Sequence, residues 1–246
     1  MSGGVAQNGG VRDALSRELR KLEAENPLLA RTDTLTTKRV GGSASKRELR
    51  KVQHDVPVIS LQDVFSKEEV DEFVDMMQET LDDPEFVVEY KIDGLAINLI
   101  YENGVFSQAV TRGDGTVGED VTSNVKTIIS IPMSIPYKQR YDIRGEVYMP
   151  KTSFERVNRE RRANGEEEFA NPRNAAAGSI RQLDSRICAS RGLDGFWYHV
   201  PDDINCSSHF DSLMYAKKLG FAYINFYTQM PNERDYVVSR IRKFLN

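Results

Sequence analysis

A lysine flanked by carboxylates stands in the segment EYKIDG, which begins at Glu89. On a β-strand alternate side chains share a face, so Glu89, Lys91 and Asp93 would point one way while Tyr90 and Ile92 point into the core. A free lysine has a pKa near ~10.4, and only about one in a thousand carries the reactive amine at neutral pH. A nearby cation or desolvation would deprotonate Lys91 and make it a nucleophile. The plainer alternative is the solvated face of an edge strand.

The pattern Lys-x-Asp-Gly is a weak signal by itself, but its surroundings add to it. Residues 89–132 read EYKIDGLAINLIYENGVFSQAVTRGDGTVGEDVTSNVKTIISIP and resemble the nucleophile motif and following hairpin of bacterial NAD-dependent DNA ligases. Residues 144–150 (RGEVYMP) resemble that family's third nucleotidyltransferase motif, and residues 169–184 (FANPRNAAAGSIRQLD) resemble a segment very specific to it. The three blocks occur in the family's order. The chain is therefore similar to the adenylation domain of these ligases over roughly residues 50–200.

The resemblance implies a three-step reaction. Lys91 would attack the α-phosphate of NAD, so that nicotinamide mononucleotide leaves and AMP stays on the lysine as a phosphoramidate. The AMP would then pass to the 5′-phosphate of nicked duplex DNA, and the 3′-hydroxyl would displace it. Covalent catalysis divides one difficult displacement into easier ones. Mg²⁺ and basic side chains would neutralise the transferring phosphate.

The resemblance also implies roles for individual residues. Lys91 and Asp93 are the expected catalytic pair, with Asp93 orienting the lysine or a metal. The expected contacts to the dinucleotide are Ser60, Leu61, Glu89 (adenine), Arg112 (nucleotide) and Glu146 (ribose), and the expected contacts to DNA phosphate or AMP are Arg173 and Arg181. Strand alternation in RGEVYMP would place Arg144, Glu146 and Tyr148 on one face.

Taken one at a time, these residues also have plainer interpretations. The stretch from Arg112 to Asp120 could simply be a turn, because Gly and Asp favour turns. Glu146 could be half of a salt bridge with Arg144 or Lys91. Arg173 and Arg181 could be surface charges. The two cysteines and three histidines show no ligand spacing, so we expect no protein metal site.

Composition and charge limit the class of protein. The chain has 246 residues, two cysteines and a net charge of −4. The length suits one large domain with a small appendage, and the cysteines are expected to be reduced thiols of a cytoplasmic protein. The negative charge argues weakly against nucleic acid as a partner, because basic residues can still cluster on one face. We expect no signal peptide or membrane span, and a monomer.

The hydrophobic pattern predicts the elements that carry these residues. We expect a helix around residues 11–22, and a connector over residues 31–52. Ser66 and Glu69 form a capping box ahead of a second helix. A strand from Phe86 to Tyr101 would be joined through Asn103-Gly104, a strong hairpin signal, to a return strand over 105–111. Further strands are expected at 141–149 and 196–200, a helix at 152–163, and a helix, strand and helix in the last forty residues.

These elements predict an α+β fold with two antiparallel sheets around a nucleotide-binding cleft and Lys91 on an inner strand. Residues 1–50 would be a flexible leader, a partial helical arm and the connector, and residues 51–246 the adenylation domain. The family's Tyr/His-rich N-terminal region and its later lysine motifs are not found. The resemblance therefore implies a chain truncated at both ends, with little nick-sealing activity of its own.

Two other functions remain open at this point. A truncated or degenerate remnant could keep the nucleotide-binding fold without turnover. ATP-dependent ligases and capping enzymes share Lys-x-Asp-Gly, but the segment 169–184 argues against them because we associate it only with the NAD-dependent group.

Overall fold

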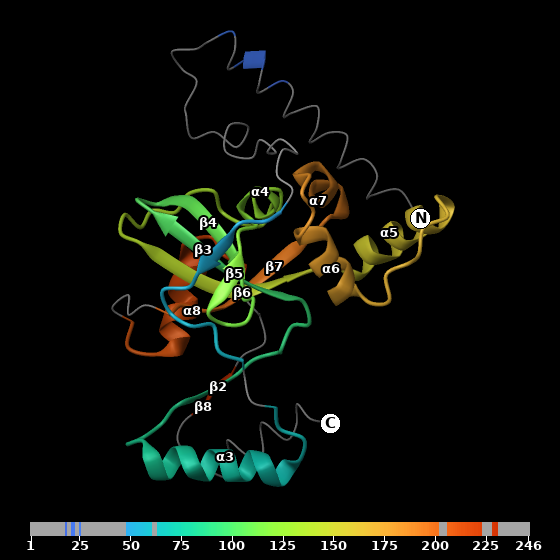
Figure 1. The fold of residues 1–246 in the computed structure, drawn as a ribbon. Helices are drawn as coiled ribbons and strands as arrows, with labels where there is room; N and C mark the ends of the chain where they lie inside the picture. Colours follow the sequence, from blue (N-terminus) through green and yellow to red (C-terminus); the bar gives the residue numbers. More distant parts are fainter. Residues whose placement is uncertain are drawn as a thin grey trace, which may run out of the picture.

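The computed structural model describes Glu18, Lys21, Leu22, Glu25 and residues 48–60, 63–201, 206–222 and 228–230. Helices and strands alternate irregularly along this part of the chain (Figure 1). The elements are β1 (Lys51–Gln53), α3 (Lys67–Thr80), β2 (Phe86–Val88), β3 (Leu95–Glu102), β4 (Val105–Thr111), β5 (Val117–Glu119), α4 (Thr122–Val125), β6 (Tyr141–Tyr148), α5 (Lys151–Ala163), α6 (Pro172–Ile180), α7 (Ser185–Arg191), β7 (Asp194–His199), α8 (His209–Lys218) and β8 (Thr228–Met230).

A four-stranded antiparallel sheet forms the centre of the fold, in the order β4-β3-β6-β7. Its first hairpin turns at Asn103 and Gly104, whose φ angles of 52° and 76° are the left-handed values that a tight two-residue turn requires. In the centre of the sheet Asn98 pairs with Arg144, and Ala96 with Glu146. The register thus aligns the strand that follows Lys-x-Asp-Gly with the RGEVYMP strand.

The two faces of this sheet differ in polarity. One face carries fully buried side chains such as Leu99, Ile143 and Trp197, and residues of α6, α7 and α8 belong to the same core. The ring of Phe221, just after α8, packs against Tyr101 at 5.4 Å between ring centres and closes that side. Strand alternation leaves the other face with Asn98, Arg144 and Glu146. This second face is the only one that could bind a charged ligand without opening the core.

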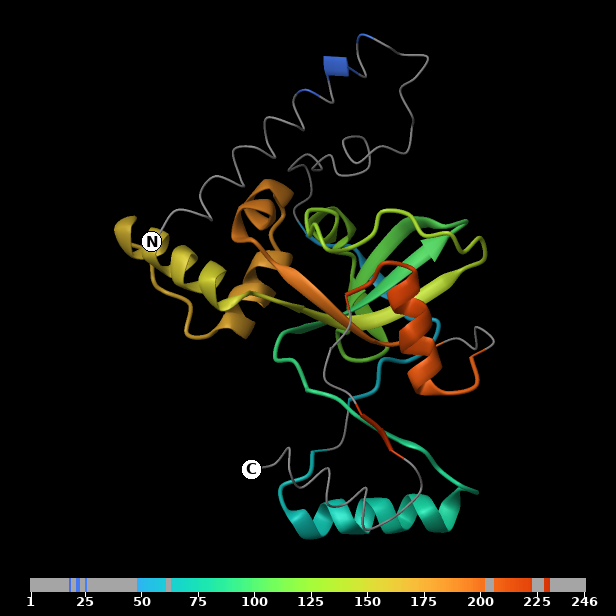
Figure 2. The ribbon, with the colours of Figure 1, turned by 180° about the vertical axis from the view of Figure 1, so that it is seen from behind.

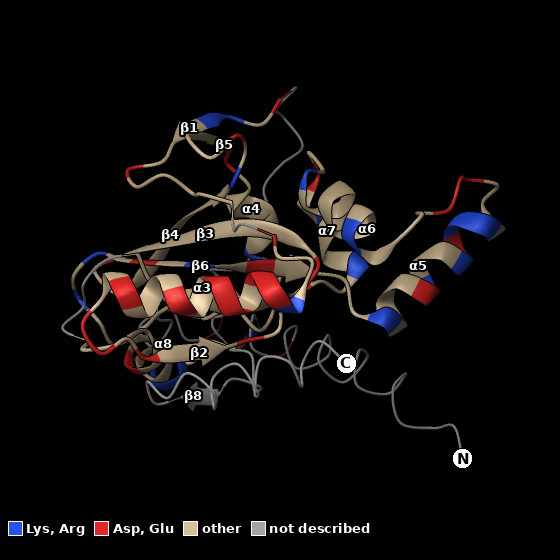
Figure 3. Cartoon of the chain, turned by 90° about the horizontal axis from the view of Figure 1, so that it is seen from below, with Lys and Arg blue, Asp and Glu red and all other residues tan. Residues whose placement is uncertain are grey.

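Two further antiparallel ribbons complete the described sheets. β1 pairs with β5, and β2 pairs with β8. Figures 1 and 2 show α3 with the β2–β8 ribbon below the central sheet, while α5, α6 and α7 stand beside it. α3 begins at Ser66, whose hydroxyl accepts the N–H of Glu69 at 3.1 Å, and a row of carboxylates runs along its surface (Figure 3). Glu69 in return accepts the N–H of Phe65. In the usual capping box the glutamate accepts the N–H of the cap residue itself, here Ser66, so this bond lies one residue earlier.

The α+β class, the hairpin, the capping box and the antiparallel pairing are confirmed. Several boundaries were wrong. The expected strand from Phe86 to Tyr101 is two strands, because β2 pairs in one sheet and β3 in another, and residues 89–94 cross between them. The glycine-rich stretch 112–120 contains β5, and the end of the expected connector at 31–52 belongs to β1.

Other expectations fall outside the described residues. They are the final helix, Leu61 and nearly all of the N-terminal helix. Cys188 and Cys206 form no disulfide within the described residues. Among the described helices, none has the length and apolar composition needed to cross a bilayer.

The core predicts a large difference between two identical substitutions. Leu99 is fully buried and Leu183 is 45% exposed. We expect Leu99→Ala to lower the free energy of unfolding by about 2–5 kcal/mol, because it leaves a cavity in a packed sheet face. Leu183→Ala should cost under about 1 kcal/mol. Urea denaturation followed by circular dichroism measures both, and equal losses would contradict the assignment of the core.

Candidate active site

The segment that carries Lys91 is a connection between two sheets. Residues 89–94 lie between β2 and β3 outside any strand, and Lys91 and Asp93 are exposed. Tyr90 is 50% exposed, so it does not enter the core as strand alternation predicted. The expectation that Lys91 stands on an inner strand was wrong, because backbone pairing with β6 begins only at Leu95. The position of Lys91 therefore depends on the residue at which the connection meets the central sheet.

Gly94 fixes that end. It is buried, and a Cβ built on it would lie 2.3 Å from the carbonyl oxygen of Val147 and 2.9 Å from Cγ of Glu146. Real Cβ atoms do not approach backbone this closely, so only glycine lets the connection pass against β6. The glycine of Lys-x-Asp-Gly thus brings the lysine segment beside Glu146, which lies 55 positions further along the chain than Lys91.

Glu146 is the largely enclosed acid of the site. Burial raises the pKa of its carboxyl group, while the hydroxyl of Tyr198 and the charges of Lys91, Arg173 and Arg112 act in the opposite direction. Tyr198 on β7 donates a hydrogen bond to Glu146 Oε2 at 3.2 Å. Tyr198 therefore contacts this carboxylate directly, and three cations from separate segments act on it electrostatically.

Arg112 is tied to the segment that precedes α3. Its Nη1 donates a hydrogen bond to Ser60 Oγ at 3.1 Å, and its backbone N–H donates to Ala96 O at 3.0 Å. The ring of His54 lies 3.0 Å from Thr111 O and 3.2 Å from Arg112 O, which holds the end of β4. The structure thus brings Ser60 and Arg112 together.

Arg144 on β6 holds the segment that precedes α3. Its guanidinium donates to Val56 O at 2.6 Å and to Pro57 O at 3.1 Å. Residues 57–60 and 112–116 then enclose a hollow of about 400 Å³ next to Arg112. A second hollow of about 220 Å³ lies at the opposite end of the same sheet face, around Asn98 and Asp142, away from Lys91.

The segment FANPRNAAAGSIRQLD presents an arginine to the lysine motif. Asn171 caps α6 by accepting the N–H of Asn174 at 2.8 Å, and Asn158 exchanges two hydrogen bonds with the backbone of Phe169. At the far end of the segment Asn124 donates to two backbone carbonyls. With both ends held, Arg173 in the first turn of α6 forms an ion pair with Asp93 at 3.0 Å. This contact joins two of the three sequence blocks.

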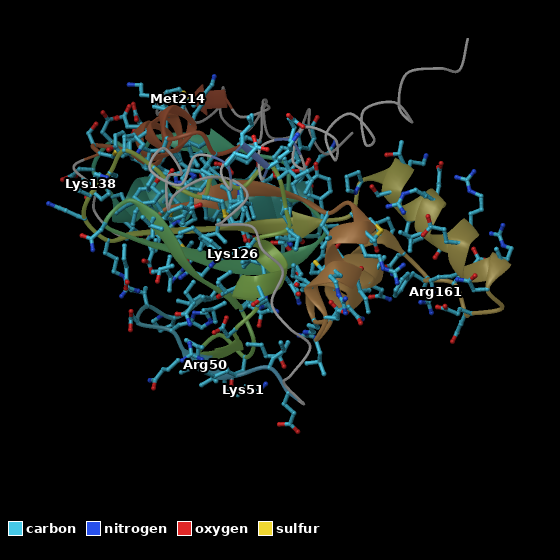
Figure 4. The ribbon with its side chains drawn as sticks, turned by 90° about the horizontal axis from the view of Figure 1, so that it is seen from above. Arg50, Lys51, Lys126, Lys138, Arg161 and Met214 are labelled. Atoms are coloured by element: carbon cyan, nitrogen blue, oxygen red, sulfur yellow. The ribbon has the colours of Figure 1, made fainter. Side chains whose placement is uncertain are left out.

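Arg181 lies apart from this group. It forms an ion pair with Glu119 of β5 at 3.0 Å, and Glu119 also pairs with Lys51 at 3.1 Å. Arg50 and Lys51 stand side by side on the surface at β1 (Figure 4). Arg181 therefore belongs to a charged cluster around the β1–β5 ribbon, whereas Arg173 belongs to the Lys91 group.

Two residues of the site escaped the sequence argument. Tyr198 contacts Glu146, and His209 at the start of α8 contacts Glu89, with Nε2 2.8 Å from Oε1. Tyr198 lies on a strand that the hydrophobic pattern did predict, so alternation could have placed it on the site face. His209 lies 120 positions from Glu89, and no sequence signal joins them.

No ready metal cage exists in the described part of the chain, where no three His, Cys, Asp or Glu side chains are grouped to hold an ion. Mg²⁺ commonly binds through substrate phosphates and only one or two carboxylates. Asp93 and Glu146 could supply such carboxylates beside a bound nucleotide. The residues present therefore suit a metal that arrives with phosphate.

Comparison with known proteins agrees with this arrangement. The family model described as NAD-dependent DNA ligase adenylation domain matches residues 46–246, which include every candidate residue. The chain belongs to this family. The adenylation-domain family thus accounts for the lysine motif, the RGEVYMP strand and the α6 segment in one fold.

Curated relatives support the same assignment. The chain is 43% identical to a DNA ligase of Mycoplasma mycoides over 93% of its own length and 37% of the relative's. It is 44% identical to a DNA ligase of Mesoplasma florum over 98% of the chain and 40% of the relative, and 48% identical to one of Lysinibacillus sphaericus over 86% and 32%. The chain thus spans between a third and two fifths of the length of these ligases.

The close approach of Gly94 makes Gly94→Ala a sharp test of positioning in this adenylation domain. The exposed connection must move away from β6, and a displacement of about 1 Å can cost about 10²-fold in rate. We expect the melting temperature to fall, because the clash is with backbone, and AMP transfer to Lys91 per folded molecule to fall by that order. Gly165→Ala is the control, because its Cβ meets nothing within 4 Å although φ is +72°. It should cost about 1 kcal/mol of stability and no activity.

Burial of Glu146 predicts a pH-dependent gain from Glu146→Gln. Because burial raises the pKa of this carboxyl group, the unfolded chain loses the proton first, and stability is lost as pH rises through the folded pKa. At acidic pH both proteins carry a neutral side chain and should melt alike. By pH 8 the variant should melt higher, with about 2–4 °C for each kcal/mol gained. Calorimetric melts at pH 4 and pH 8 measure this, and a gap that narrows with pH would contradict it. Exposed Glu167→Gln should show no such trend.

Proposed function

We propose that this chain forms a covalent lysyl-AMP at Lys91 from NAD and releases nicotinamide mononucleotide. The Lys91 nitrogen attacks the α-phosphorus, a P–N bond forms, the P–O bond to the mononucleotide breaks, and the amine loses a proton. In a complete ligase the AMP then passes to the 5′-phosphate of nicked duplex DNA for strand sealing. The observation that carries the proposal is the ion pair of Arg173 with Asp93 at 3.0 Å, which sets the α6 segment against the lysine connection that Gly94 packs beside Glu146.

Each side chain has a task that its chemistry suits. Arg112 and Arg173 are permanent cations that would offset charge on the transferring phosphate. Glu146, held by Tyr198, would accept hydrogen bonds from ribose hydroxyls, and Glu89 would accept one from adenine. Ser60 would contact the dinucleotide beside Arg112, and the resemblance assigns the same role to Leu61. We assign Asp93 to orienting Lys91 through its ion pair with Arg173.

The site would open between the central sheet face and the segments that cover it. We propose that residues 51–246 form the nucleotidyltransferase core, with the nucleotide against β3, β6 and β7. Mg²⁺ would supply Lewis-acid stabilisation of the α-phosphate, with Asp93 and Glu146 as the available carboxylates. Arg181 would contact DNA phosphate from the β1–β5 side, at a distance from the reacting atoms.

The cellular setting follows from this activity. We propose a monomer that acts on nicked DNA in replication and repair within the cytoplasm. Two free thiols, with the pKa of buried Cys188 raised to about 11 by desolvation, suit a reducing compartment.

The decisive experiment is the intact mass of the folded chain after incubation with Mg²⁺ and NAD, and separately with ATP. We expect a gain of one AMP with NAD only, because the family uses the dinucleotide, and no gain for Lys91→Ala. Lys138→Ala is the matched control, because Lys138 is an exposed lysine next to Gly104 of the β3–β4 turn, at the opposite end of β3 from Gly94. A gain of one AMP by the Lys91→Ala variant would mean that another residue is the nucleophile. No gain with either nucleotide from a folded chain would favour the non-catalytic alternative.

A further inference from the structure

Glu89 is held by a histidine from the other end of the chain. His209 Nε2 lies 2.8 Å from Glu89 Oε1, and the Glu89 side chain is only 18% exposed. Glu89 belongs to the irregular connection that carries Lys91, where no strand pairing fixes it. The contact to His209 is therefore the restraint that fixes where this carboxylate points.

His209 itself is presented by a rigid turn. Ser208 caps α8 by accepting the N–H of Asp211 at 3.1 Å, and the carboxylate of Asp211 accepts hydrogen bonds from Ser207 at 2.6 Å and Ser208 at 3.0 Å. Further along the helix Leu213 and Ala216 are buried in the fold. Because helix and cap are both anchored, the position of the His209 ring is set by α8 and not by the connection.

This restraint limits what Glu89 can recognise. An ionised carboxylate is only an acceptor, and one lone-pair site on Oε1 faces His209 Nε2 at 2.8 Å. The other oxygen, Oε2, is left to accept from a donor at a fixed place. A 6-aminopurine offers an N–H donor on its exocyclic nitrogen. A 6-oxopurine places an acceptor there, and its nearest donor is the neighbouring ring N1–H.

We propose that His209 is a positioning residue that makes this site select a 6-aminopurine nucleotide over a 6-oxopurine nucleotide. The inference rests on the proposed function, in which Glu89 contacts the base. A carboxylate free to move could follow the donor from the exocyclic nitrogen to N1, and the two bases would then bind alike. A carboxylate held by His209 meets the oxygen of the oxopurine with unfavourable charge, and the discrimination follows.

The test uses AMP and IMP, which differ only in this part of the base, as probes for the full chain in calorimetric titrations. We expect His209→Ala to weaken AMP binding about tenfold through lost preorganisation and to leave IMP binding nearly unchanged, so that the AMP preference falls. His209→Gln keeps a donor at similar reach and should restore most of the preference. Lys218→Ala, an exposed change at the far end of the same helix, should behave as wild type.

A second pair of variants separates positioning from a general effect on the fold. In a Glu89→Ala background the preference for AMP should already be lost, and adding His209→Ala should change neither binding constant. An unchanged AMP-to-IMP ratio in His209→Ala, or an equal loss in both backgrounds, would overturn the inference alone. If the folded wild-type chain gains AMP on Lys91 but binds AMP and IMP equally, the proposed function stands and the inference fails. If it neither binds AMP nor gains it, both fail.

Discussion

Close contact between two backbones governs the candidate site. At Gly94 the connection from β2 meets the carbonyl of Val147 on β6, where any side chain would collide with the strand. That approach ends the connection, starts the pairing of β3 and places Lys91 beside Glu146. Arg173 reaches Asp93 only because both ends of the α6 segment are held by asparagine side chains. The chemistry of the site thus depends on a glycine that takes no part in it.

Positive charge is concentrated at the candidate site although the net charge of the whole chain is negative. The protein carries a net charge of −4, yet Lys91, Arg112 and Arg173 all act on the carboxylate of Glu146. Burying that carboxylate costs stability, and the cations and Tyr198 offset only part of the cost. Active sites commonly keep such an arrangement because the groups are preorganised for a charged ligand. A phosphate entering among the cations would add a second anion to the field that Glu146 now experiences.

A second set of residues holds the loops and does none of the chemistry. Arg144 clamps residues 56 and 57, His54 holds the end of β4, and His209 holds Glu89. Each contact joins a segment without regular pairing of its own to a strand or a helix. Such segments have few packing contacts to fix them, so directed hydrogen bonds set their positions. Strands and helices thereby hold the irregular segments of the site in place.

The sequence by itself determined the α+β class, the Asn103-Gly104 hairpin, the capping box at Ser66 and the identity of the lysine motif. These features depend on neighbouring residues, whose spacing and turn chemistry are readable locally. It misplaced Lys91 on a strand. The pairing of β3 with β6 begins only at Leu95, and β6 lies far along the chain. It could not separate Arg173 from Arg181, or find Tyr198 and His209 as partners of Glu146 and Glu89. Only the tertiary structure decided these contacts, because they join residues far apart in sequence through the register of the sheet and the packing of α6 and α8.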